Sequence, residues 1–244
     1  MGRGEISQRV QPGASRELVE RLGGHPAARF GIDLEREAGR GTWLVAACLL
    51  SVRGGETRAG AGIAALARAG LADLAVLAEA ERTAVHRALE DARIAEAEAV
   101  AARLLRAGRA LAARHAGSLD TLARSALDLE ELAAHLARLA PGFGAATIAR
   151  FLRPLRAVWP AAREVPLAPA ARAAALDLGW LAEGEDEDGE PAALRAALAG
   201  DPEEPAFADV EAALERLGAA ACLRGRPARC PLAGDCPRLG RDDA

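Results

Sequence analysis

Apolar residues recur at helical spacing along most of this chain, and this periodicity constrains the fold more than any other feature. Between residues 96 and 115, Val100, Leu104, Leu105 and Leu111 fall on one face of a helix with a period of about 3.6 residues. Alanine, leucine and arginine dominate, whereas valine, isoleucine and aromatic residues, which favour strands, are few. The sequence therefore predicts an all-α protein.

Several local signals predict where helices lie. The stretch TWLVAACLL at 42–50 is apolar on nearly all sides, which predicts a helix buried in the middle of a bundle with Cys48 as a small core residue. Ser15 is expected to cap the first helix. Asp128 is expected to cap a later one, with Glu131 three residues on completing a capping box.

A tight turn, Pro-Gly-Phe-Gly at 141–144, separates two of the predicted helices. Gly142 and Gly144 permit positive φ and carry no side chains, so backbone amides at the start of the next helix can approach an anion such as a DNA phosphate. An ordinary short connection between helices would use the same residues, and both interpretations stay open on this pattern alone.

Charge and cysteine content limit the possible environments. The formal net charge of -4 argues against a protein that coats nucleic acid, but it permits a local basic face. No run of 18 or more apolar residues occurs and residues 1–11 lack a signal-peptide core, so we expect a soluble, cytoplasmic protein without a membrane partner. Three of the four cysteines crowd between 222 and 236, which favours a metal or cluster over disulfides.

Three separated segments resemble, in the right order, the helix-hairpin-helix (HhH-GPD) DNA glycosylase superfamily, and endonuclease III most closely. They are the buried helix with its following turn (46–66), the glycine hairpin (139–152) and the cysteine loop (217–236). The resemblance implies a two-domain all-α fold: a helical barrel domain over 39–158, and a second domain built from 1–38 plus 159–244 that carries an iron-sulfur-type cysteine loop at 222–236.

The same resemblance implies where double-stranded DNA would bind. Gly142 and Gly144 fall on the positions whose amides hold a phosphate, and Arg150 follows on the next helix. Arg53 stands in the turn from which the family inserts a polar side chain into the DNA stack, although a plain surface turn residue would fit equally well.

The catalytic positions depart from the family. Ala146 stands where the bifunctional members have their attacking lysine, and the chain contains no lysine, so a Schiff base would need the N-terminal amine. Counting without gaps from Ala146 puts the family's catalytic carboxylate on Glu164, whereas alignment on Trp159 puts Val165 there. Glu164 is either a stand-in for the catalytic acid or a solvent-facing residue beside Arg163. The extra methylene of a glutamate would displace its carboxylate by about 1 Å from the position of the family's aspartate, and such a displacement can cost about a hundredfold in rate.

The cysteine loop is one ligand short. Cys222, Cys230 and Cys236 match the first, third and fourth ligands of the family's [4Fe-4S] loop, and Pro227 occupies the position of the second. Three cysteines could hold a four-iron cluster whose last iron is bound by water or another side chain, a three-iron cluster, or zinc. Alternatively, the metal has been lost and the loop remains as packing.

These observations leave three functional hypotheses. The first is a monomeric, endonuclease III-like DNA-binding protein of the base-excision repair superfamily, without AP-lyase activity and without any catalysis if Glu164 is not an acid. The second is an active monofunctional DNA glycosylase that removes a flipped-out damaged base with Glu164. The third is a structural or partner-binding helical protein that does not bind DNA.

Overall fold

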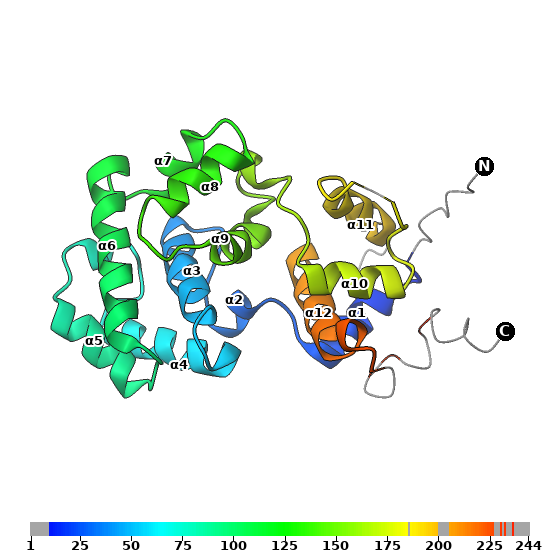
Figure 1. Cartoon of the computed structure of the whole chain (residues 1–244), viewed down its shortest axis with the longest axis horizontal. Helices are drawn as coiled ribbons and strands as arrows, with labels where there is room; N and C mark the ends of the chain where they lie inside the picture. The colour runs from blue at the N-terminus through cyan, green and yellow to red at the C-terminus, as the bar shows by residue number, and fades with distance from the viewer. Residues whose placement is uncertain are drawn as a thin grey trace. The chain divides into compact units, whose positions relative to one another are not determined.

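The computed structural model describes residues 10–184, 186–199, 205–226, 230, 232 and 236. The chain divides by its internal contacts into two units, Pro26–Arg163 and the pair of segments Met1–His25 and Glu164–Ala244 (Figure 1). Every regular element among the described residues is helical and none is a strand, which confirms the all-α prediction. None of the helices in this part of the chain combines the length and the apolar character needed to cross a bilayer.

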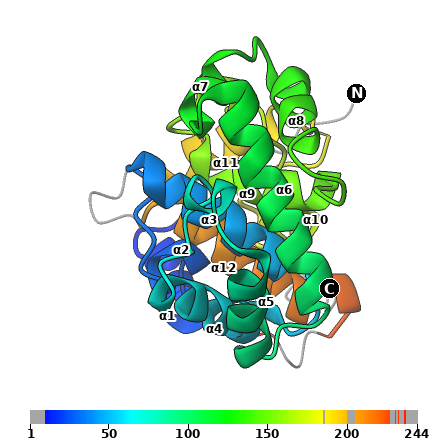
Figure 2. The ribbon, with the colours of Figure 1, turned by 90° about the vertical axis from the view of Figure 1, so that its left-hand side faces the viewer.

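The Pro26–Arg163 unit is organised around α3 (Glu37–Leu50), in which every side chain from Trp43 to Leu49 is buried. The long α6 crosses this unit in Figure 2 and contacts α3. The unit contains, besides α3, the elements α2 (Pro26–Arg29), α4 (Gly55–Arg68), η1 (Val76–Ala78), α5 (Arg82–Asp91), α6 (Ala97–His115), α7 (Leu119–Arg124), α8 (Leu129–Ala137), α9 (Ala145–Leu152), η2 (Arg153–Leu155) and η3 (Pro160–Ala162).

The borders of this unit lie at 25/26 and 163/164, whereas the sequence placed them at 38/39 and 158/159. The segment before α3 packs on α4: Arg29 forms an ion pair with Glu56, and the Phe30 ring lies against Gly60. Since α3 begins at Glu37, a border at 39 would cut through a helix. At the other end η3 contacts α8 and buries Ala162 completely.

The second unit contains α1 (Ala14–Leu22), α10 (Pro169–Asp177), α11 (Glu190–Leu198), α12 (Phe207–Ala220) and η4 (Cys222–Arg224). Helices α10 and α12 pack so closely that an ideal Cβ on Gly218 would lie 1.8 Å from the carbonyl oxygen of Ala170. No residue but glycine fits there without a backbone shift. The side chain of Arg172 pairs with Glu190, which is 2% exposed, and so joins α10 to α11.

The start of α8 agrees with its sequence signal. Asp128 Oδ1 accepts a hydrogen bond from the Glu131 amide at 2.8 Å, which confirms Asp128 as the N-cap. Glu131 Oε2 in turn accepts from the amide of Leu127 at 2.9 Å rather than from that of Asp128, so the reciprocal half of the capping box is displaced by one residue.

The expected cap of the first helix is wrong. Helix α1 begins at Ala14, and its N-cap is Gly13 in the left-handed region with φ 83°. Ser15 lies inside the helix and is 3% exposed. Ser15 and Leu18 are three residues apart and share the buried face, so the burial of this face, and not the capping preference of serine, sets where the helix begins.

Replacing the confirmed cap gives a test of this local structure. We expect Asp128→Ala to lower the free energy of unfolding by about 1 kcal/mol, because the Glu131 amide loses its acceptor. Asp128→Asn keeps an acceptor at the same place and should stay within a few tenths of a kcal/mol of the parent protein. Urea unfolding followed by circular dichroism measures both, and equal losses in the two variants would contradict the capping role.

Candidate nucleic-acid interface

The glycine turn forms a compact connection between α8 and α9. Phe143 is 4% exposed and anchors the turn in the core, whereas Gly142 and Gly144 on either side are exposed. Gly142 has φ +93°, a backbone conformation that favours glycine. Gly144 is the N-cap of α9 in an extended conformation, with open space where a side chain would start.

Backbone amides at the start of α9 face solvent. The carbonyl oxygen of Gly144 accepts from the amides of Thr147 and Ile148 at 3.0 and 3.1 Å. The amides of Gly144, Ala145 and Ala146 have no acceptor in the described part of the chain, and all three residues are exposed. Unpaired amides and the positive end of the helix dipole make such a place favourable for an anion.

Arg103 of α6 places a positive charge directly over this turn. An ideal Cβ on Gly142 would lie 2.7 Å from Arg103 Nε and 3.1 Å from Nη2, so the guanidinium takes the space that a side chain would fill. Its Nη1 also lies 3.8 Å from the Sγ of Cys48 on α3. Burial raises the pKa of the Cys48 thiol, and the hydrogen bond from Arg103 lowers it only in part. The thiol therefore stays neutral and leaves the charge of Arg103 uncompensated.

A hydroxyl pair joins α9 to the end of α3 and holds a second arginine. Ser51 Oγ donates to the carbonyl of Ala47 at 2.9 Å and lies 2.8 Å from Thr147 Oγ1. Arg150 Nη1 donates to the same Ser51 oxygen at 3.0 Å. The guanidinium of Arg150 is thereby fixed at the turn that follows α3.

Arg53 lies exposed in that same turn. We name the group formed by Arg53, Arg103, Gly142, Gly144 and Arg150 the hairpin surface. None of its three arginines forms an ion pair with another described residue. Arg103 was not among the residues predicted from the sequence, since a residue on α6 gives no local signal that it covers a turn between α8 and α9.

The proposed catalytic acid is placed differently. Glu164 belongs to the unit that does not contain the hairpin, is exposed, and makes no hydrogen bond or ion pair with the described residues. Val165, the other residue that alignment puts at this position, is 1% exposed. Ala146, at the family's lysine position, is exposed on the first turn of α9.

The three C-terminal cysteines lie near the end of α10. Cys222 and Cys230 pack against the buried cluster of their unit, and the thiol of Cys236 donates to the carbonyl of Asp177 at 3.7 Å. Burial, a hydrogen bond to the Asp177 side chain and the neighbouring cysteines raise the pKa of Cys222 to about 12. Residues 227–229, 231 and 233–235 of the expected loop lie outside the described residues, and among the described ones no three His, Cys, Asp or Glu side chains converge on a single ion.

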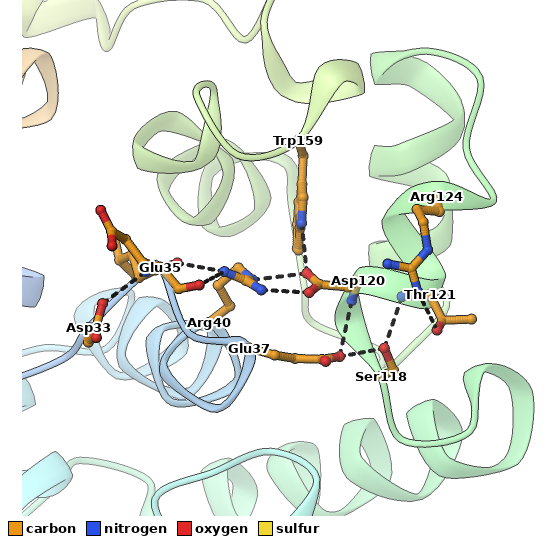
Figure 3. A network of polar contacts seen from close by, with 10 residues as sticks. Asp33, Glu35, Glu37, Arg40, Ser118, Asp120, Thr121, Arg124 and Trp159 are labelled. Atoms are coloured by element: carbon orange, nitrogen blue, oxygen red, sulfur yellow. Dashed lines mark hydrogen bonds and ion pairs between the residues drawn. The ribbon is translucent and has the colours of Figure 1, made fainter.

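A second polar network lies near the start of α3 (Figure 3). Arg40 donates from Nε and Nη2 to the two carboxylate oxygens of Asp120 at 2.9 and 2.5 Å. Trp159 Nε1 donates to Asp120 Oδ1 at 2.9 Å. Burial raises the pKa of Asp120, but the hydrogen bonds from Arg40 and Trp159 and the charge of Arg40 bring it below its ordinary value. The carboxylate is therefore an ionised structural group.

A pocket of about 520 Å³ lies beside this network. Trp159 and Asp120 form part of its wall, and the side chain of Leu127, which is 91% exposed, stands at its edge. Asp120 already accepts three hydrogen bonds, so it offers the pocket no free base, and Arg124 adds a cation to the otherwise mostly apolar wall.

Comparison with known proteins does not assign the chain to a family. No family model matches it, and no curated protein matches it as a relative. Functional conclusions therefore depend on the geometry of the residues themselves.

The Arg40–Asp120 pair gives a pH-dependent prediction. Arg40 is 6% and Asp120 21% exposed in their side chains, so Asp120→Asn should lower the free energy of unfolding by about 2 kcal/mol at pH 7, because it leaves a buried guanidinium without an anionic partner. The lowered pKa means that this contribution is present above about pH 4 and is lost as pH falls through the folded value. Urea unfolding between pH 7 and pH 3 should show the difference between parent and variant shrink on the acid side, and a difference that stays constant would contradict a stabilising role for the ionised carboxylate.

Proposed function

We propose that this chain binds double-stranded DNA by its phosphate backbone through the hairpin surface, as an endonuclease III-like protein without AP-lyase chemistry. The observation that carries the proposal is the meeting of exposed, unpaired amides at Gly144, Ala145 and Ala146 with arginines that have no carboxylate partner among the described residues. Amides and guanidinium groups are the donors that proteins use most on phosphate oxygens.

The arrangement of the donors favours a phosphate, rather than a carboxylate of the chain itself, as the anion that they bind. Arg103 lies over Gly142, while Arg150 is held through Ser51 beside α9, so cations flank the amides from two different helices. A phosphate offers several acceptor oxygens and can accept from amides and guanidinium groups together. The neighbouring turn adds Arg53, whose planar side chain suits either a second phosphate or an unstacked base.

The overall acidity of the chain is compatible with this role. Six of the eight residues at 183–190 are acidic, which is more negative charge than the whole net charge of -4. This acidic segment is far from the hairpin in sequence. Binding would be weak and salt-dependent, with a dissociation constant on the order of 10⁻⁶ to 10⁻⁴ M at physiological salt, as expected for contacts to the backbone alone.

Replacing Arg103 tests whether its charge contacts a phosphate. Arg103→Ala should weaken binding to a fluorescein-labelled duplex about tenfold at low salt and reduce the slope of log affinity against log salt by about 1, because one phosphate contact is lost. Arg106→Ala, an exposed arginine on the same helix, is the matched control and should leave both quantities unchanged. Equal effects of the two substitutions in fluorescence anisotropy titrations would contradict a specific role for Arg103.

A substitution at Gly144 separates DNA binding from folding. Gly144 is the N-cap of α9 with space for a side chain, so Gly144→Asp should leave the free energy of unfolding unchanged or raise it by a few tenths of a kcal/mol. The new carboxylate would occupy the amides and repel phosphate, and duplex affinity should fall at least about tenfold. A folded Gly144→Asp variant that binds duplex as well as the parent protein would overturn the proposal.

The absence of lysine predicts that the chain has no lyase activity at abasic sites. Because the chain has no lysine, it should not nick a duplex that carries an abasic site, and borohydride should trap no adduct on an internal residue. Denaturing gels and peptide mapping measure both outcomes. A trapped adduct on any residue other than the N-terminal amine would contradict the absence of lyase chemistry.

A further inference from the structure

The pocket beside the Arg40–Asp120 pair lies entirely within the Pro26–Arg163 unit. Its volume of about 520 Å³ falls in the range of about 300 to 1,000 Å³ that is typical of sites for small molecules. Its walls come from α7, from the connection between α7 and α8, and from the segment around Trp159. No residue of the hairpin surface lines this pocket, so the proposed binding of DNA does not account for it.

Most of the wall is apolar, and part of it is open to solvent. Leu127 and Val158 are two of the four large apolar side chains that are exposed among the described residues, and both line this pocket. Trp159 is a fixed part of the wall, because its ring packs edge-on against Phe151 and its Nε1 donates to Asp120. A ligand that covered Leu127 and Val158 would remove exposed apolar surface from water, which is favourable.

Arg124 places one cation on this apolar wall. Its Nη2 donates to Thr121 Oγ1 at 3.1 Å, which holds the guanidinium against α7 (Figure 3). Arg124 forms no ion pair within the described part of the chain, and most of its N–H groups stay available. A guanidinium with free N–H groups binds a carboxylate through a pair of parallel hydrogen bonds.

Asp120, the other charged residue of the wall, does not satisfy Arg124. The charge of Arg124 contributes to the lowered pKa of Asp120, so the two side chains lie near each other. Both carboxylate oxygens are already hydrogen-bonded to Arg40, and one of them also to Trp159. Glu37, the next acid of this network, accepts from the Asp120 amide and does not line the pocket. Arg124 is therefore the charge that a ligand would meet.

We infer that this pocket binds a small organic acid, whose single carboxylate pairs with Arg124 and whose apolar body covers Leu127 and Trp159. One cation on an otherwise apolar wall suits a monoanion with an apolar body. A phosphate ester carries more charge and more acceptor oxygens than this wall can pair with donors. The inference is independent of DNA binding, because its test contains no DNA and replaces no residue of the hairpin surface.

Octanoate is the probe that combines both features. Isothermal titration of the full chain should show saturable binding with a dissociation constant on the order of 10⁻⁴ M. In ¹⁵N-labelled protein the indole N–H resonance of Trp159 should shift, whereas that of Trp180, in the core of the other unit, should not. Octanamide keeps the chain without the charge, and acetate keeps the charge without the chain, so each should bind at least about tenfold more weakly than octanoate.

Substitutions test the two parts of the site separately. Arg124→Gln should weaken octanoate binding at least about tenfold, because it removes the charge and the paired hydrogen bonds. Arg138→Gln, at the exposed C-cap of α8 and outside the pocket, is the matched control and should bind as the parent protein does. Leu127→Ser should weaken binding about threefold or more by removing apolar contact, and the fold does not depend on this exposed side chain.

Three results would overturn the inference. They are a parent protein without saturable octanoate binding, equal affinities for octanoate and octanamide, and an Arg124→Gln variant that binds octanoate as tightly as the parent protein does. Sedimentation velocity tests the other occupant of an apolar pocket, a second copy of the chain. Self-association that Leu127→Ser abolishes, in a protein that does not bind octanoate, would show that a second copy covers the pocket in place of an organic acid.

Discussion

The burial of α3 is the constraint on which the Pro26–Arg163 unit depends. Its side chains from Trp43 to Leu49 are all in the core, and each part of the helix fixes a different neighbour. Arg40 near its start holds Asp120 of α7, and Trp43 Nε1 donates to the carbonyl of Phe151 in α9 at 3.1 Å. At its end Cys48 contacts Arg103 and Ser51 accepts a hydrogen bond from Arg150, two arginines of the hairpin surface. A helix that is apolar all round can only sit in the middle of a bundle, and its polar ends then determine where the surrounding helices dock.

The arginines that lie on α3 or contact it serve two different purposes. Arg40 is buried and satisfied by a carboxylate and by the carbonyls of Leu34 and Glu35, so its charge is used for structure. Arg103 and Arg150 are held instead by a thiol and a hydroxyl, which orient a guanidinium without cancelling its charge. The difference between an anionic and a neutral partner distinguishes the arginines that stabilise the fold from those left available for an outside anion.

The features that could be predicted from the sequence are local, and those that could not depend on tertiary packing. The helical periodicity, the buried helix at 42–50 and the Asp128 cap all follow from residues within one or two turns of each other, and the structure contains them. Ser15 failed as a cap because its side chain belongs to a buried face, a fact decided by packing against other helices. Arg103 and Asp120 were not anticipated, since each contacts residues brought near only by the fold. The roles in DNA and metal binding stay predictions.

The complete use of arginine in place of lysine has a consequence for how the hairpin surface behaves in a cell. Acetyltransferases modify amines, and this chain offers them no side-chain amine at all. Regulation of the proposed phosphate contacts would therefore depend on ionic strength, on a competing polyanion or on arginine methylation.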